Sequence, residues 1–360
     1  MKLKNIAIAF LGALLFATCS KKDDEKEYTA EESKAVVRST MDNFYNCLQN
    51  LNDGGFANFF HELLFKEAVR DQDGETQSWG NFLGEKFDKQ NFAEGLTEGD
   101  RFNYHRMKGT YTWNKNTELW EKTANNENVT FIFPATKGAT NNGKLVIDQY
   151  EDTETTYGND KVYLPTAAHL YATIDNTKVF EVTVKNVTFE KKTNFTMPLS
   201  AHISIYTNPF TTTIQWNRQN PENFVFDFAF SSPQGCTTGL HADIKLTTSD
   251  YGNISSLEKA IDKIAFTATQ GELRIVGNID VKSLEEKGND RKLRVEEINT
   301  YAKAVLMKGN SKIADVKYEE ENDKGVIYFI FSDGSREKAE KYVSDFEDRV
   351  TKIFKRFDRK

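Results

Sequence analysis

The chain reads Asn223-Phe224-Val225-Phe226-Asp227-Phe228-Ala229-Phe230-Ser231 at the stretch that decides its fold. Phenylalanine stands at every second position of this stretch. Side chains of a β-strand point alternately to its two sides, so the spacing predicts a strand with one aromatic face. A strand of this half-apolar kind belongs to an antiparallel sheet with one face covered.

The same period of two continues on both sides of this stretch. A phase change near Lys185-Asn186 predicts a β-bulge. All six prolines lie between residues 134 and 233, which agrees with strands that start, end or bend there. Further strands are expected at 109–113, 119–123, 128–133, 144–150, 161–174, 178–189, 200–206, 211–217 and 239–248.

The two ends of the chain carry helical periods. Thr29 and Glu32 form a capping-box pattern, and apolar residues then recur every three or four positions up to Leu51. Further helices are predicted at 56–69 and around 79–87. The C-terminal third alternates helices at 255–264, 295–306 and 336–357 with strands at 271–281, 312–319 and 325–332.

These patterns predict an α+β fold. A large curved antiparallel sheet, which could curl into a half-barrel, packs against N-terminal and C-terminal helices. We expect one domain over residues 29–360. Within it, helices occupy 29–96, a β-rich part occupies 101–250, and 251–360 is mixed.

The N-terminus has the layout of a signal peptide. Lys2 and Lys4 precede an apolar stretch, Ile6 to Ala17, which is too short for an ordinary membrane-spanning helix. The sequence Leu15-Phe16-Ala17-Thr18-Cys19 resembles a lipobox. This resemblance implies cleavage after residue 18, acyl chains on Cys19, and a lipidated tether over 19–28. Two or more acyl chains give stable membrane anchoring.

The charged segment behind Cys19 resembles the export signal of Bacteroidota surface lipoproteins. Lys22-Asp23-Asp24 supplies the lysine followed by acidic residues. The resemblance implies an outer-membrane protein held by its acyl chains and displayed on the cell surface.

Charge and cysteine content limit the remaining function classes. The formal net charge is −7 and becomes −9 when Lys2 and Lys4 leave with the signal peptide. Because nucleic-acid binding depends on Lys and Arg contacts to phosphates, no nucleic-acid partner is expected. Cys47 and Cys236 are either a disulfide in an oxidising compartment or two buried thiols, and the sequence leaves both open.

Motifs for catalysis, metals and cofactors are absent from the sequence. No P-loop, dinucleotide fingerprint or Gly-x-Ser-x-Gly occurs, and residues 71–75 lack EF-hand spacing. We therefore expect no cofactor, no metal and no catalytic residue. His169, His202 and His241 fall on polar strand faces and are expected to meet solvent, whereas His105 is expected to be partly buried.

The aromatic ladder of Phe224, Phe226, Phe228 and Phe230 has two interpretations. It packs beneath helices as core, or it lines a cavity for a lipid or other hydrophobic ligand. The second arrangement resembles, in architecture alone, the open-barrel lipoprotein carriers of the LolA and LppX type.

The sequence leaves three functions to be tested. The first is a non-enzymatic envelope lipoprotein that binds a protein or takes part in an assembly. The second is a carrier of a lipid or hydrophobic ligand. The third is a glycan-binding module or hydrolase, which would need an exposed Trp113, Trp120 or Trp216 beside two carboxylates.

Overall fold

The computed structural model describes residues 26–70, 76–95, 97–98, 101–157, 160–191, 196–250, 257–289 and 291–357. The predicted signal peptide, Cys19 and the predicted export signal Lys22, Asp23 and Asp24 lie outside the described residues. Residues 71–75 lie outside them as well. Within the described ranges, no helix has the length and apolar character needed to cross a membrane.

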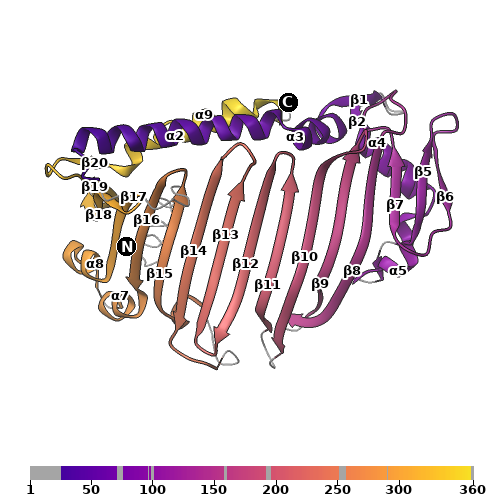
Figure 1. Cartoon of the computed structure of the whole chain (residues 1–360). Coiled ribbons are helices and arrows are strands. Elements are labelled where there is room, and N and C mark those ends of the chain that lie inside the picture. Colours follow the sequence, from indigo (N-terminus) through magenta and orange to yellow (C-terminus); the bar gives the residue numbers. More distant parts are fainter. Residues whose placement is uncertain are drawn as a thin grey trace. The chain divides into compact units, whose positions relative to one another are not determined.

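Sixteen strands form one predominantly antiparallel sheet (Figure 1). Their order is β6-β5-β7 and then β8 through β20 in sequence, so β6 and β20 stand at the two ends of this order. The first eight are β5 (Gly109–Asn114), β6 (Leu119–Thr123), β7 (Val129–Phe133), β8 (Gly143–Tyr157), β9 (Asp160–Ile174), β10 (Thr177–Lys191), β11 (Thr196–Thr207) and β12 (Phe210–Asn220). The other eight are β13 (Asn223–Ser231), β14 (Thr237–Leu246), β15 (Ile261–Gln270), β16 (Leu273–Asp280), β17 (Ala302–Lys308), β18 (Ser311–Glu321), β19 (Lys324–Ile330) and β20 (Arg336–Lys338).

The expectation of purely antiparallel pairing is wrong at one place. β7 runs parallel to β5, with Gly109 opposite Val129. The β5–β6 hairpin puts β6 on one side of β5, and the chain then returns to the other side of β5 through residues 124–128. A strand that returns in this way enters in the same direction as β5.

The predicted bulge in β10 is confirmed. The register with β11 shifts between Lys185 and Thr188, and Asn186 has a positive φ of 55°. Two prolines lie beside further register shifts, because Pro165 stands opposite Asp152 and Pro198 stands opposite Phe189. Proline cannot donate to the ladder, so it is tolerated where the pairing is already interrupted.

In the sequence, the helices of the described residues lie before, between and after the strands of this sheet. They are α2 (Ala30–Asp53), α3 (Gly55–Phe60), α4 (Trp79–Lys89), α5 (Tyr104–Met107), α6 (Leu257–Ala260), α7 (Val281–Gly288), α8 (Val295–Tyr301) and α9 (Phe346–Phe354). The capping box is confirmed, because Thr29 Oγ1 accepts from Glu32 N at 3.2 Å and Glu32 Oε2 accepts from Thr29 N at 2.9 Å.

Four predicted helices are too long. Residues 67–70 form β1 (Glu67–Arg70), which pairs with β2 (Thr76–Ser78). Residues 261–264 open β15, and 302–306 belong to β17. Residues 336–338 form β20, followed by a 3-10 turn. In each case pairing with a neighbouring strand overrides the local helical pattern.

The chain divides into two compact units. Among the described residues, the first unit comprises 26–49 and 213–353, and the second comprises 50–212 and 354–357. Each unit has its own buried hydrophobic cluster.

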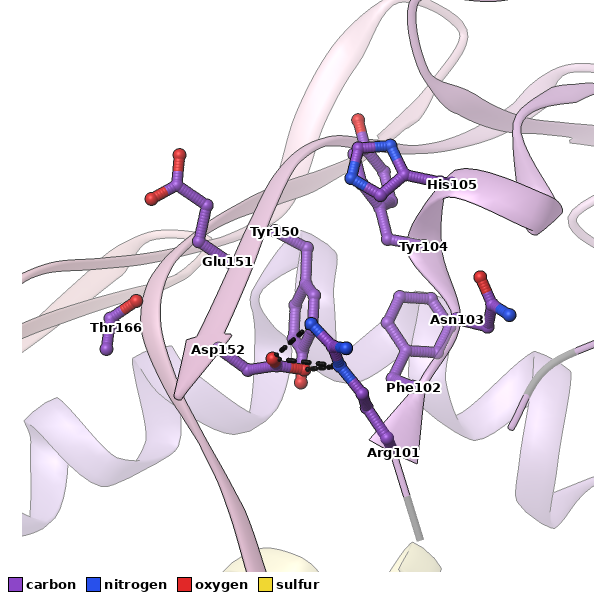
Figure 2. Close-up of a pocket in the computed structure, with 9 residues that line it drawn as sticks. All are labelled: Arg101, Phe102, Asn103, Tyr104, His105, Tyr150, Glu151, Asp152 and Thr166. Atoms are coloured by element: carbon purple, nitrogen blue, oxygen red, sulfur yellow. Dashed lines mark hydrogen bonds and ion pairs between the residues drawn. The ribbon is translucent and has the colours of Figure 1, made fainter. Parts of the chain in front are cut away.

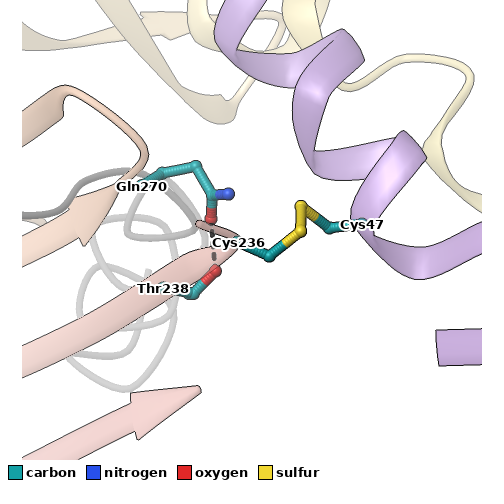
Figure 3. Close-up of a disulfide and its surroundings, with 4 residues drawn as sticks. All are labelled: Cys47, Cys236, Thr238 and Gln270. Atoms are coloured by element: carbon teal, nitrogen blue, oxygen red, sulfur yellow. Dashed lines mark hydrogen bonds between the residues drawn. A yellow bond between two sulfur atoms is a disulfide. The ribbon is translucent and has the colours of Figure 1, made fainter. Parts of the chain in front are cut away.

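In the first unit, α2 runs above strand turns (Figure 1). Cys47 of α2 is joined by a disulfide to Cys236, beside the β13–β14 turn, with Cα atoms 5.7 Å apart (Figure 3). Seven residues earlier, Thr40 lies beside Gly271 in the β15–β16 turn. Seven helical residues rise about 10.5 Å, and two strand spacings measure about 9.6 Å. The helix therefore meets successive hairpin turns at a heptad interval.

In the second unit, an aromatic cluster fills the space between α4 and the sheet. Its buried members are Trp79, Leu83, Phe87, Tyr104, Met107, Tyr111, Trp113, Trp120, Val129 and Phe133. At the end of α2, Gly54 packs against the turn before β12. A Cβ on Gly54 would lie 2.3 Å from the carbonyl oxygen of Asn208, so this approach requires glycine.

Candidate functional site

A polar and aromatic cleft of about 310 Å³ lies in the second unit (Figure 2). It is formed where β4 (Arg101–Phe102) and α5 meet the middle of β8. Asn103 caps α5, because its side-chain oxygen accepts from Arg106 N at 3.2 Å. This cap turns the chain between the two elements. The lining residues are Arg101, Phe102, Asn103, Tyr104, His105, Tyr150, Glu151, Asp152 and Thr166.

An ion pair between Arg101 and Asp152 lies within this cleft. Arg101 Nε donates to the two carboxylate oxygens at 3.0 and 3.1 Å, and its NH2 nitrogen lies 2.8 Å from Oδ1. The Asp152 side chain is only 2% exposed, whereas that of Arg101 is 53% exposed. The register between β8 and β9 shifts between Glu151 and Asp152. This shift re-aims the carboxylate toward the arginine.

Three aromatic rings give the cleft its apolar wall. The Phe102 and Tyr150 rings meet edge to face at 4.9 Å. Burial raises the pKa of the Tyr150 phenol, and the nearby Asp152 carboxylate adds to the rise. Tyr104 donates its hydroxyl to the backbone oxygens of Glu127 at 3.3 Å and Ile147 at 3.4 Å. Burial raises the pKa of Tyr104 too, followed by the charge of Asp148.

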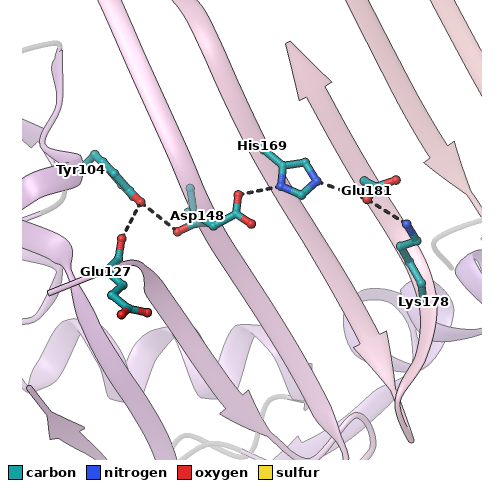
Figure 4. Close-up of polar contacts among 7 residues, drawn as sticks. Tyr104, Glu127, Asp148, His169, Lys178 and Glu181 are labelled. Carbon is teal, nitrogen blue, oxygen red and sulfur yellow. Dashed lines mark hydrogen bonds and ion pairs between the residues drawn. The ribbon is translucent and has the colours of Figure 1, made fainter. Parts of the chain in front are cut away.

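A chain of polar contacts lies beside Tyr104 (Figure 4). Asp148 is the extra residue at a shift in the β8–β9 register, and its Oδ1 lies 2.6 Å from His169 Nδ1. The other ring nitrogen of His169 lies 3.2 Å from Glu181 Oε1, which also accepts from Lys178 Nζ at 2.8 Å. Burial opposes the charged imidazole, but hydrogen bonds to Glu181 and Asp148 outweigh it and raise the pKa of His169.

The first unit contains a second histidine between two carboxylates. His241 stands opposite Asp227 in the β13–β14 register, with Nδ1 2.7 Å from Asp227 Oδ1. Its Nε2 lies 3.3 Å from Asp243 Oδ2. The hydrogen bond to Asp227 is the largest influence and raises the pKa of His241. His241 is exposed, as expected, whereas His169 is half-buried, and each has charged partners that sequence analysis did not assign.

The four phenylalanines of the ladder differ in how deeply they are buried. Phe224 is fully buried, with its ring centroid 4.7 Å from that of Trp216. Phe226, Phe228 and Phe230 are half-buried. Phe226 packs against the main cluster of the first unit.

The tryptophans do not provide the binding surface that a glycan site needs. Trp113 and Trp120 are buried in the second unit's cluster, with ring centroids 5.6 Å apart. Their indoles cannot stack on a ligand from solvent. Trp216 is half-buried against Phe224.

Three other residues were left open or misplaced by sequence analysis. Of the two alternatives for Cys47 and Cys236, the structure has the disulfide. His105 is exposed at the cleft, not partly buried, because residues 104–107 form a helical turn and not a strand.

The cleft residues themselves were missed, and only a weak signal pointed to them. Arg101-Phe102-Asn103-Tyr104-His105 groups a cation with aromatic and polar side chains in a short connection. Such connections often carry function. The partner residues Tyr150 and Asp152 are some fifty residues away, so only the register of β8 brings them to the same place.

The lining offers hydrogen-bond donors and acceptors beside aromatic surface. This combination can hold and orient a polar ligand. Within the described ranges, no group of three or more His, Cys, Asp or Glu side chains is placed to hold a metal ion. No family model, curated protein or solved structure matches the chain.

Proposed function

We propose that the chain is a non-enzymatic lipoprotein of the cell envelope that acts as a binding component. Acyl chains on Cys19 hold it in the outer membrane, and the export signal Lys22-Asp23-Asp24 directs it to the cell surface. The α+β class, with N-terminal and C-terminal helices packed on the sheet, is part of this proposal.

The observation that carries the binding role is the cleft at Arg101 and Asp152. The carboxylate is buried and held by two nitrogens of one guanidinium, so its geometry is fixed before a ligand arrives. Pre-organised polar groups beside aromatic rings cost little further ordering when a partner binds. The occupant that suits this lining is a polar group of a partner molecule, such as an amide or hydroxyl.

The anchoring half is tested with Cys19→Ser. The wild-type protein should fractionate with membranes and show the mass of an acylated chain that begins at Cys19. The variant should lose both properties. Membrane association and an unchanged mature mass in Cys19→Ser would refute lipidation at this residue.

The binding half is tested by photo-crosslinking in cells. A photoreactive residue at Glu151, in the cleft, should give a discrete adduct. The same residue at Lys144, exposed on the same strand, should not. The adduct should disappear when Asp152→Asn removes the charge that holds Arg101. Equal adducts from both positions, or an adduct that survives Asp152→Asn, would remove the cleft from the proposal.

A second candidate function is a carrier of a lipid or hydrophobic ligand. The half-buried Phe226, Phe228 and Phe230 favour it, because three aromatic rings on one strand face stay partly accessible. Native mass spectrometry of protein purified from cells should then show a bound lipid. Replacing Phe228 by Ser should release it, and protein free of lipid would exclude this candidate.

A further inference from the structure

Where the chain enters the first unit determines which end of that unit meets the bilayer. The described chain starts at Lys26, whose backbone N–H donates to Ser311 Oγ at 2.8 Å. Ser332 Oγ donates to the Tyr28 carbonyl oxygen at 3.3 Å. The Tyr28 ring has the Lys26 and Lys308 ammonium groups at 4.6 and 5.9 Å. The entry point is therefore tied to the turn that joins β17 to β18.

The covalent chain sets how far this turn can be from an anchored Cys19. Lys26 is seven positions after Cys19. A fully extended chain spans at most ~3.6 Å per residue, which gives about 25 Å. If Cys19 is acylated, the Gly309–Asn310 turn lies within about that distance of the lipid headgroups.

The opposite end of the same strand lies farther away than the tether can reach. β18 runs from Ser311 to Glu321 and ends at the Asn322–Asp323 turn. Eleven residues of strand span about 35 Å. Measured from the start of the tether at Lys26, the β17–β18 turn is therefore the near turn and the β18–β19 turn is the far turn.

The charges at the two ends agree with this direction. The far turn carries Glu319, Glu320, Glu321 and Asp323, and the Asp323 side chain is 94% exposed. Anionic lipid headgroups repel such a turn. Near the other turn, Arg274 donates to the Gly309 carbonyl oxygen, and Lys308 forms an ion pair with Glu272. Most of these acids and bases are paired within the unit, so the tether is the main orienting element.

We infer that the β17–β18 turn of the first unit faces a lipid bilayer surface and that the acidic β18–β19 turn faces away from it. This inference rests on the proposed anchoring at Cys19. It adds which surface of the protein is turned to the membrane and which is presented to the surroundings.

Energy transfer from single labelled cysteines tests the orientation. Asn310→Cys and Lys324→Cys place a donor dye at exposed positions beside the near and far turns. The native disulfide and the acylated Cys19 leave no competing thiol. The mature lipidated protein is placed in phosphatidylethanolamine–phosphatidylglycerol vesicles with a headgroup acceptor. Transfer should be clearly more efficient from position 310 than from position 324.

A variant with a longer tether, and the amount of protein that stays on the vesicles, show whether the tether sets the orientation and whether the anchor exists. Inserting about twenty Gly/Ser residues after Ser20 adds roughly 25 Å of root-mean-square reach and should shrink the difference. An unchanged difference would contradict the tether as the orienting element. Equal or reversed transfer from vesicle-bound protein overturns the orientation alone. Protein that does not stay on vesicles overturns the anchoring proposal, and this inference with it.

Discussion

The side chain of Gln90 forms two hydrogen bonds with the backbone of Trp120, as a neighbouring strand would. Trp120 N donates to Gln90 Oε1 at 2.7 Å, and Gln90 Nε2 donates to the Trp120 carbonyl oxygen at 2.9 Å. Trp120 lies in β6, which ends the sheet order. An edge strand presents unpaired backbone groups that invite association with other chains. The amide of Gln90 therefore satisfies the backbone groups of this edge strand at Trp120, its most buried residue.

Replacing Gln90 by Ala should weaken the second unit. Two hydrogen bonds are lost and two partly buried backbone groups are left without them, so the free energy of unfolding should fall by about 1–3 kcal/mol. Urea denaturation measures this loss, and size-exclusion chromatography measures association through the opened edge. Gln219→Ala, at an exposed glutamine of β12, is the matched control and should leave both unchanged. A Gln90→Ala protein as stable as wild type would contradict the role given to this side chain.

Removing the disulfide should destabilise the first unit strongly. Cys47 and Cys236 are 189 residues apart, so their bond closes a long loop in the unfolded chain. The double substitution to Ser should lower the free energy of unfolding by about 2–5 kcal/mol. Alkylation of denatured, unreduced protein, read by mass spectrometry, checks the bond itself. Modification of either cysteine in that sample would show that the pair is not formed.

The stability contributed by His241 should depend on pH. Its pKa is raised above the ordinary value near 6.5 in the folded protein, chiefly by the hydrogen bond to Asp227. The stabilisation is therefore fully present below pH ~6.5 and is lost as the pH rises through the higher folded pKa. His241→Gln should lower the unfolding midpoint at pH 6 and have less effect at pH 9.

An NMR titration of the imidazole tests the cause of that shift. The pKa of His241 should fall back toward its ordinary value in Asp227→Asn. Asp243→Asn should have a smaller effect, because its hydrogen bond is longer. A wild-type pKa at or below 6.5 would rule out the charged bridge.

Arg101 and Asp152 should be energetically coupled. Removing the arginine leaves a carboxylate that is 2% exposed without its partner. Arg101→Ala should therefore cost about 1–3 kcal/mol of stability, and much less when Asp152 is already Asn. The exposed pair Lys161–Glu154, which joins β9 to the same strand β8, is the control and should show no measurable coupling. Additive effects of the two cleft substitutions would show that the ion pair does not support the cleft.

Sequence reasoning succeeded where the signal was local and unambiguous. β13 has the predicted bounds, 223–231, because a period of two in phenylalanine excludes a helix. Thr29 and Glu32 start α2 as predicted, since both groups of the cap lie within one turn. It failed at 261–264, where Ile261 and Ile264 have helical spacing, and at 302–306, where Ala302, Ala304 and Leu306 also fit a period of two. There the neighbouring strands decide the outcome.

By itself, the sequence determined that this chain forms an antiparallel-rich sheet with a capped first helix, because alternation and capping act between residues close along the chain. Only the tertiary structure decided that Cys47 meets Cys236, that Asp227 and Asp243 hold His241, and that Arg101 finds Asp152 in a cleft. Those partners are set by strand register and by where α2 crosses the turns. Register depends on contacts between distant segments, and a shift of one residue would move every side chain to the other face.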